Sequence, residues 1–286
     1  MSFTAVEPID FAFTQFIQSL SSPALDLFMQ AVSLLGNPAT WFLIAAFLFW
    51  SGKEKESFYL ANIVLFAALF TAAIKDLIQR PRPSAEQFKV QGELFQESIE
   101  SSYSYSSGFP SGHATLISAV TVFYHKTIEK KLKILLFAAA FLVIISRIYL
   151  GQHFLSDVIA GAFLGALIGK ADSLFREKTL GKDLGGEIRH HPVIWGAVIA
   201  SMALLFILSN SSIFYPLLGF YAGIFALKEL KIENRGSVKK LLIGFPVLFI
   251  LVFSAMKFDS SILLFLSGVW VTFFNPLLFK LFFKDN

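Results

Sequence analysis

Residues 57–74 read SFYLANIVLFAALFTAAI, a run of eighteen residues without a charged side chain. As a helix, such a run is long enough to cross the roughly 30 Å of hydrocarbon in a bilayer. Similar runs occur at 192–227 and 260–279, and the chain is 55% hydrophobic with a mean hydropathy of +0.66. The sequence therefore predicts an all-α, polytopic transmembrane helical bundle rather than a soluble protein.

The same reading along the chain predicts about nine spans. They are expected at 38–51, 57–77, 111–126, 132–149, 154–170, 192–209, 213–229, 238–256 and 260–280. Residues 8–36 instead mix apolar positions with polar ones and carry Asp10 and Asp26. We expect interfacial amphipathic helices there, ahead of the first span, rather than a tenth crossing.

Three short groups of polar and charged residues interrupt the apolar pattern. In chain order they are Lys75-x6-Arg82-Pro83, Pro110-Ser111-Gly112-His113 and Ser146-Arg147-x5-His153-x3-Asp157. Charged side chains are costly in or beside a bilayer, so their presence there indicates a function. The predicted organisation is an N-terminal interfacial segment at 1–36, a core with the three motifs at 37–170, and four additional transmembrane helices of unknown role at 171–286.

The distribution of Lys and Arg predicts the orientation of the chain. With the nine spans above, eighteen of the 24 Lys and Arg residues fall in segments on one side and six on the other. The positive-inside rule makes the richer side cytoplasmic. All three motifs then lie on the extracytoplasmic face, although the count was made without reference to them. We therefore expect them to form a single site.

The first two motifs suit the binding of an anion. Lys75 and Arg82 are two helical turns apart, and the prolines beside Arg82 are expected to end the helix, which leaves both cations at its outer end. Ser111 is a favoured N-cap for the third span, where free N–H groups can bind an anion. Gly112 allows the backbone to approach a ligand closely. Each motif alone is weak evidence for an anion site. Lys and Arg at the end of a transmembrane helix, for example, often reach only to the lipid headgroups.

The third motif supplies a base and an acid. His153 and Asp157 are four residues apart, so a helix would place them on one face. There the carboxylate could fix the imidazole tautomer and stabilise its cationic form. With Arg147 and His113, the three motifs contain what is needed to hold a phosphate and attack it.

All eleven specified positions of the three motifs resemble the signature of the type 2 phosphatidic acid phosphatase family, over roughly residues 9–170. The resemblance implies that His153 is the nucleophile and forms a phosphohistidine, that Asp157 supports it, and that His113 protonates the leaving group. It also implies a phosphate cradle, formed by Lys75, Arg82, Ser111, Gly112 and Arg147. Residues 37–170 would then be the phosphatase core.

The expected function is a multi-pass phosphatase of the bacterial inner membrane that hydrolyses a lipid phosphate or pyrophosphate at the extracytoplasmic face. The lipid stays open among phosphatidate, phosphatidylglycerophosphate, undecaprenyl pyrophosphate, lipid A and sphingoid phosphates. One alternative is a sugar-phosphate phosphatase similar to glucose-6-phosphatase, which the nine-span layout resembles and from which Asp157 departs. Another is a non-enzymatic transporter or scaffold.

The expected partners are the lipid substrate and membrane lipids. No cofactor and no metal are expected, since the chain has no cysteine and the motifs hold one carboxylate. No basic face with interleaved aromatics is present, which argues against nucleic-acid binding. The oligomeric state is not predicted. Gly161, Gly165 and Gly169 predict close helix packing, and the Ser- and Tyr-rich loop at 84–110 is either a lid or a connector.

Overall fold

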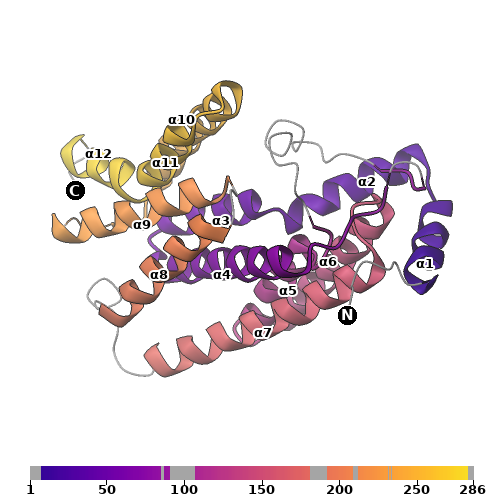
Figure 1. Cartoon of the computed structure of the whole chain (residues 1–286). Helices are drawn as coiled ribbons and strands as arrows, with labels where there is room; N and C mark the ends of the chain where they lie inside the picture. The colour runs from indigo at the N-terminus through magenta and orange to yellow at the C-terminus, as the bar shows by residue number, and fades with distance from the viewer. Residues whose placement is uncertain are drawn as a thin grey trace. The chain divides into compact units, whose positions relative to one another are not determined.

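The computed structural model describes residues 8–84, 87–90, 107–180, 192–208, 212–230, 232 and 234–282, and every regular element within these ranges is a helix (Figure 1). The chain forms two compact units, Met1–Thr40 with Phe66–Thr179, and Trp41–Leu65 with Leu180–Asn286. The fourth helix contributes to both units. Because most of the predicted loop at 84–110 lies outside the described residues, its role as a lid stays untested.

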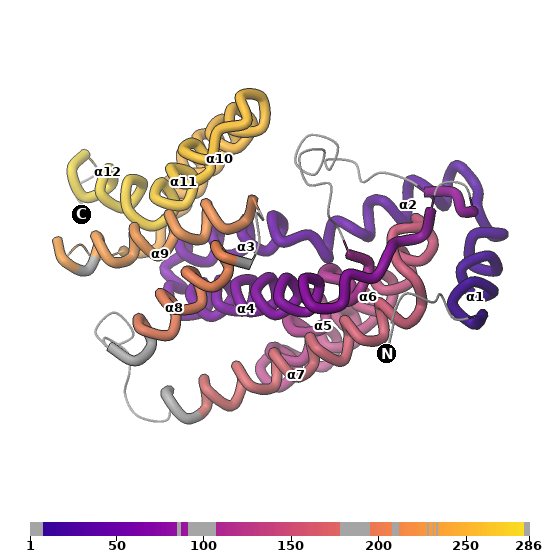
Figure 2. Tube along the Cα trace, viewed as in Figure 1, coloured from indigo at the N-terminus to yellow at the C-terminus, as the bar shows by residue number. Residues whose placement is uncertain are grey.

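The first unit contains the helices that carry the three motifs. Its elements are α1 (Pro8–Ser19), α2 (Pro23–Ser33), η1 (Leu34–Gly36), the second part of α4 (Glu54–Ile78), α5 (Gly112–Tyr124), α6 (Lys130–Tyr149) and α7 (Leu155–Leu180). The α6 helix contacts α1, α2 and α5, which can be followed along the trace in Figure 2. The N-terminal helices are therefore packed parts of this unit.

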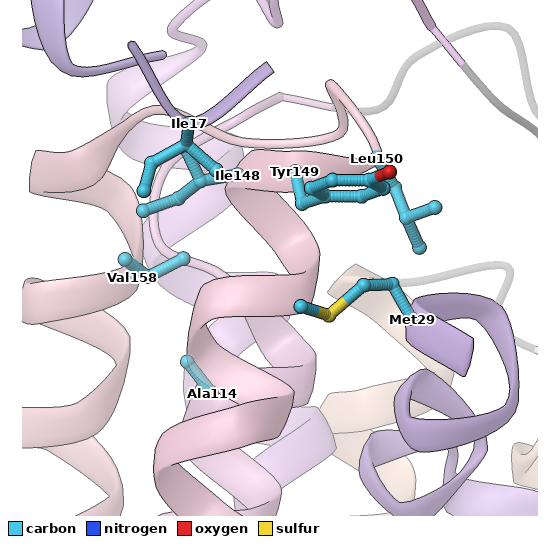
Figure 3. Close-up of a cluster of buried hydrophobic side chains, with 7 residues drawn as sticks. All are labelled: Ile17, Met29, Ala114, Ile148, Tyr149, Leu150 and Val158. Atoms are coloured by element: carbon cyan, nitrogen blue, oxygen red, sulfur yellow. The ribbon is translucent and has the colours of Figure 1, made fainter. Parts of the chain in front are cut away.

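A small apolar cluster joins five helices at one end of this unit. Figure 3 shows its members, which come from α1, α2, α5, the end of α6 and the start of α7: Ile17, Met29, Ala114, Ile148, Tyr149, Leu150 and Val158. The last turn of α6 and the first turn of α7 lie on either side of His153. The cluster thus fixes the two ends of the third motif against the N-terminal helices.

Small residues bring α7 against the backbone of α5, as the sequence predicted. A Cβ on Gly161, Gly165 or Gly169 would lie 2.5, 2.1 or 2.2 Å from a carbonyl oxygen of α5. These contacts confirm that the glycines serve close packing. They hold the start of α5, with the second motif, against the helix that follows His153.

Because the space beside Gly165 is filled by main-chain atoms, Gly165→Ala is expected to destabilise the protein by about 1–3 kcal/mol. Thermal unfolding in detergent would measure this as a lower Tm. Gly196→Ala, in α8, is the matched control, since a Cβ there has nothing within 4 Å. Equal Tm values for the two variants would contradict the packing described here.

The second unit is built from α3 (Pro38–Trp50), the first part of α4, α8 (Pro192–Leu208), α9 (Phe214–Glu229), α10 (Val238–Phe258), α11 (Ser261–Val269), the π-helical turn η3 (Trp270–Phe274) and α12 (Asn275–Phe282). The buried Trp50 donates from its indole Nε1 to the carbonyl of Val271 at 2.8 Å. Its ring packs on Gly244, where a Cβ would lie 2.6 Å from the indole. The residues of α3 are thus tied to the C-terminal helices.

Helices occur at all nine positions where spans were predicted, and the chain is a multi-pass membrane protein. Five of them are long and apolar enough to cross a bilayer: Glu54–Ile78, Lys130–Tyr149, Leu155–Glu177, Val238–Phe258 and Ser261–Phe282. A sixth span would be Pro23–Gly36 with Pro38–Trp50, which bend by 56° at Asn37. The α5, α8 and α9 helices have 13, 17 and 16 residues, fewer than the roughly 20 that a span needs. The number nine therefore stays a prediction.

The two compact units divide the chain at other places than the predicted organisation, which itself stays a prediction. The change between units at 179–180 lies near the predicted boundary at 170, but residues 41–65 group with the C-terminal helices rather than with the motifs. The interfacial position of the N-terminal segment stays a prediction. Its Asp10, Thr14 and Ile17 are all buried.

Candidate active site

The second motif opens α5 in the way the sequence predicted. Ser111 is the N-cap, and its Oγ accepts a hydrogen bond from the Ala114 N–H at 3.5 Å. The Ser111 N–H in turn donates to the carbonyl of Asp157 at 3.0 Å, which joins the second motif to the third. A Cβ on Gly112 would meet nothing closer than Thr71 Cγ2 at 3.6 Å, so protein packing does not require this glycine. Its role in phosphate binding stays a prediction.

His113 lies against the end of the N-terminal segment. A Cβ on Gly36 would come within 2.7 Å of His113 Cδ2 and 2.8 Å of its Cβ. Only glycine therefore allows η1 to approach this histidine. Sequence reasoning did not place Gly36 at the site, because nothing local to residue 36 indicates a neighbour more than seventy positions away.

The cations of the motifs are held by side-chain and backbone oxygens. Lys75, in the last turn of α4, donates from Nζ to the carbonyl of Ser107. Arg82 lies beyond the end of that helix, and one of its guanidinium nitrogens donates to Gln152 Oε1 at 3.0 Å. Arg147 is almost fully buried at the end of α6, where it donates to Ser33 Oγ at 2.5 Å. The cradle cations are thus oriented before any ligand binds.

His153 is buried and has two oxygen neighbours at its Nδ1 atom. The carbonyl of Gly108 lies at 2.7 Å and Asp157 Oδ2 at 3.7 Å. A carbonyl oxygen can only accept, so this hydrogen bond places the proton on Nδ1 and leaves the Nε2 lone pair available for attack. The shorter contact that orients the imidazole is therefore the one to Gly108.

Asp157 has closer partners than the imidazole. Its Oδ2 accepts from the Phe154 N–H at 2.8 Å and its Oδ1 accepts from Arg80 at 2.7 Å. His153 precedes the first residue of α7, so the spacing of four arises at a helix start and not along a helical face. The predicted pairing of Asp157 with His153 is present as a looser contact of 3.7 Å.

Charged residues from all three motifs influence the pKa of His153. Burial, which disfavours the charged imidazolium, lowers the pKa of His153 well below its ordinary value. The charges of Arg82, Lys75, Arg147 and His113 lower this pKa further. All three motifs therefore act on one imidazole, which is neutral at pH 7 and can act as a nucleophile.

Sequence reasoning missed Arg80, which belongs to none of the three motifs. Arg80 is 5% exposed and its guanidinium bridges two carboxylates, Asp157 at 2.7 Å and Asp10 at 2.6 Å. It also lies over the Phe154 ring, 5.1 Å from the centroid. The available signal was Asp10, the one charged residue of α1, since buried charges need partners.

Within the described part of the chain, no group of three or more His, Asp or Glu side chains could hold a metal ion. The carboxylates near His153 are instead occupied by Arg80 and by main-chain N–H groups. Positive charge at this site comes from Lys and Arg side chains.

The model of the PAP2 superfamily matches residues 56–180, a stretch that holds all three motifs. This part of the chain is similar to the PAP2 superfamily. The N-terminal helices that contact His113, Arg147 and Arg80 lie outside this PAP2 region, as does most of the second unit.

The chain is similar to curated proteins of bacteria. It is 28% identical to a lipid A 4'-phosphatase of Porphyromonas gingivalis over 166 aligned residues. These residues make up 54% of this chain and 66% of that protein. It is 29% identical to phosphatidylglycerophosphatase B of Bacillus subtilis over 177 aligned residues. These residues make up 57% of this chain and 81% of that protein. The chain thus spans less than two thirds of the length of the first of these relatives.

Among solved structures, the chain is similar to a transmembrane PAP2 type phosphatidylglycerolphosphate phosphatase from Bacillus subtilis. The two are 27% identical with a TM-score of 0.48, over 59% of this chain and 85% of that chain.

Proposed function

We propose that this protein is an integral membrane phosphatase that hydrolyses a lipid phosphate or lipid pyrophosphate at the extracytoplasmic face, through a phosphohistidine. The observation that carries the proposal is the state of His153: buried, with a lowered pKa, its Nδ1 bonded to Gly108, and surrounded by the charges of the other motifs. The match of residues 56–180 to the PAP2 superfamily and the names of the relatives support the class of substrate.

The proposed reaction has two steps. Nε2 of neutral His153 attacks phosphorus, the N–P bond forms, the bond to the leaving oxygen breaks, and protonated His113 gives its proton to that oxygen. Water then attacks the phosphohistidine, His113 takes a proton from it, and breakage of the N–P bond releases phosphate and restores His153. Lys75, Arg82, Arg147 and the N–H groups at the start of α5 stabilise charge on the phosphoryl oxygens in both steps.

A site at the edge of a bilayer suits a lipid substrate, because the acyl chains stay in hydrocarbon while the headgroup reaches the cations. The excess of Lys and Arg in the opposite segments supports the extracytoplasmic location. No observation favours the sugar-phosphate alternative, and Asp157, which departs from that pattern, is fully buried and bonded.

Phosphate release by the purified protein tests the proposal. The panel comprises phosphatidate, phosphatidylglycerophosphate, undecaprenyl pyrophosphate, lipid A and a sphingoid phosphate, with glucose 6-phosphate as the soluble comparison. We expect release from at least one lipid and none above the His153→Ala background from glucose 6-phosphate. Release from glucose 6-phosphate alone would favour the sugar-phosphate alternative, and release from no substrate would refute a phosphatase.

Topology is tested by cysteines placed in this cysteine-free chain. Ser84→Cys, just after the first motif, is expected to react with an impermeant maleimide in intact cells. Lys239→Cys, at the start of α10, should react only after lysis. Both positions are exposed, so a difference in labelling reports the side of the membrane. The reverse pattern would move the site to the cytoplasm.

Activity is expected to persist in excess EDTA without added magnesium, because side-chain cations rather than an ion meet the charge of the phosphoryl group. Vanadate, which adopts the five-coordinate geometry of phosphoryl transfer, should inhibit by occupying the cradle beside His153. Initial rates with and without chelator, and at increasing vanadate, measure both effects. Complete loss in EDTA that magnesium restores would contradict the metal-independent mechanism.

A further inference from the structure

Arg80 connects the N-terminal helix α1 to the third motif. One guanidinium nitrogen lies 2.6 Å from Asp10 Oδ2, and the other lies 2.7 Å from Asp157 Oδ1 and 2.5 Å from Ser156 Oγ. All of these contacts are buried or partly buried. A buried ion pair of this kind is held in one geometry, and removal of a single partner leaves an uncompensated charge.

The main chain of the same residue reaches the other neighbour of the nucleophile. The carbonyl of Arg80 accepts from the Gly108 N–H at 2.6 Å, and the carbonyl of Gly108 bonds His153 Nδ1 at 2.7 Å. A Cβ on Gly108 would lie 3.1 Å from Pro81 O and 3.2 Å from Asp157 Oδ2. Arg80 therefore touches both groups that lie beside Nδ1, with its backbone on one and its side chain on the other.

Asp10 anchors this arrangement from α1. Its Oδ1 accepts from the Ser156 N–H at 2.8 Å and its Oδ2 accepts from Ser156 Oγ at 2.6 Å, in addition to Arg80. Burial opposes ionisation of Asp10, but the hydrogen bonds from Ser156 and Arg80 outweigh it and leave its pKa below the ordinary value. Asp10 is thus ionised and pairs with one guanidinium nitrogen of Arg80, while Asp157 pairs with the other.

We propose that Arg80, anchored by Asp10, is a positioning residue that holds Asp157 and the Gly108 carbonyl in place around His153. The inference rests on the proposed function, in which Nε2 attack turns the neutral imidazole into a cation with its proton still on Nδ1. Stabilisation of that cation depends on the distances from Nδ1 to Gly108 O and Asp157 Oδ2. Arg80 touches neither the imidazole nor the phosphate, so its effect falls on the rate of the chemical step.

The test compares kcat and KM of Arg80→Gln, Arg80→Lys and Asp10→Asn with the wild type, on a lipid phosphate that the wild type hydrolyses. We expect Arg80→Gln and Asp10→Asn to lower kcat on the order of 10²-fold, as a misplacement of about 1 Å can do, with KM changed less than about threefold. Arg80→Lys, which keeps the charge, should recover part of the rate. The double variant Arg80→Gln with Asp10→Asn should lower kcat by much less than the product of the two single-variant factors, because both substitutions disrupt the same contact.

The matched control is Glu177→Gln, which removes an exposed carboxylate that pairs with Lys126 at 3.0 Å near the opposite end of α7 from Asp157. Its kcat should equal that of the wild type. Added guanidinium should raise the rate of Arg80→Ala and not that of Asp10→Asn. A purely structural role would give no such rescue.

Folded variants at Arg80 and Asp10 with wild-type kcat would overturn the proposal. So would failure of all of them to fold, which would make Arg80 and Asp10 structural residues only. These outcomes are distinct from failure of the proposed function, in which the wild type itself releases no phosphate from any substrate of the panel.

Discussion

His153→Ala is expected to abolish turnover, with a loss in kcat of at least about 10⁴-fold, because His153 is the group that we propose forms the covalent intermediate, while the other site residues bind phosphate or transfer protons. The fold should persist, since the side chain makes one hydrogen bond, to Gly108, and the surrounding cations are held by other residues. Acid-quenched reactions with a radiolabelled phosphoryl group should trap a phosphoprotein in the wild type and none in the variant. Phosphate binding should survive the substitution.

The control for this variant is His125→Ala, at the end of α5, whose imidazole bonds the carbonyl of Val122 far along the helix from the motifs. It should retain wild-type kcat. A His153→Ala enzyme with more than about a tenth of the wild-type rate would remove His153 from the role of nucleophile.

His113→Ala should produce the second largest effect, and its size should depend on the leaving group. For an alkyl phosphate such as a lipid substrate, loss of the general acid is expected to lower kcat by about 10²–10⁴-fold. For p-nitrophenyl phosphate, whose leaving group needs no proton, the loss should be less than about tenfold. The ratio of the two losses, measured on one protein preparation, separates proton donation from simple misfolding. Equal losses on both substrates would show that His113 does not protonate the leaving group.

Features that depend on neighbours in sequence were predictable. The N-cap at Ser111, the end of α4 before Arg82, and the close packing at Gly165 each follow from local backbone chemistry or from helical spacing. The assignment of residues to the site was possible because the motif spacings resemble a family signature.

The contacts that complete the site were not predictable in this way. Arg80 and Asp10 are seventy residues apart, and Gly36 meets His113 across a similar separation, so neither pair leaves a local pattern. The orientation of His153 by a backbone carbonyl was also missed, because a carbonyl belongs to every residue and its direction depends on tertiary structure. His153 and Asp157 do meet, at 3.7 Å, but across the start of α7 rather than along one helical face, because the helix begins between them.

The sharing of α4 between the two compact units has a consequence for the design of fragments. The family match ends at residue 180, which invites excision of a minimal enzyme at that point. Such a fragment would retain residues 41–65 but none of their unit partners from the C-terminal half, and Trp50 would lose both the acceptor for its indole N–H and the glycine beneath its ring. The two compact units alternate along the chain. The C-terminal helices complete the burial of Trp50 at the end of α3, a helix that precedes the first motif.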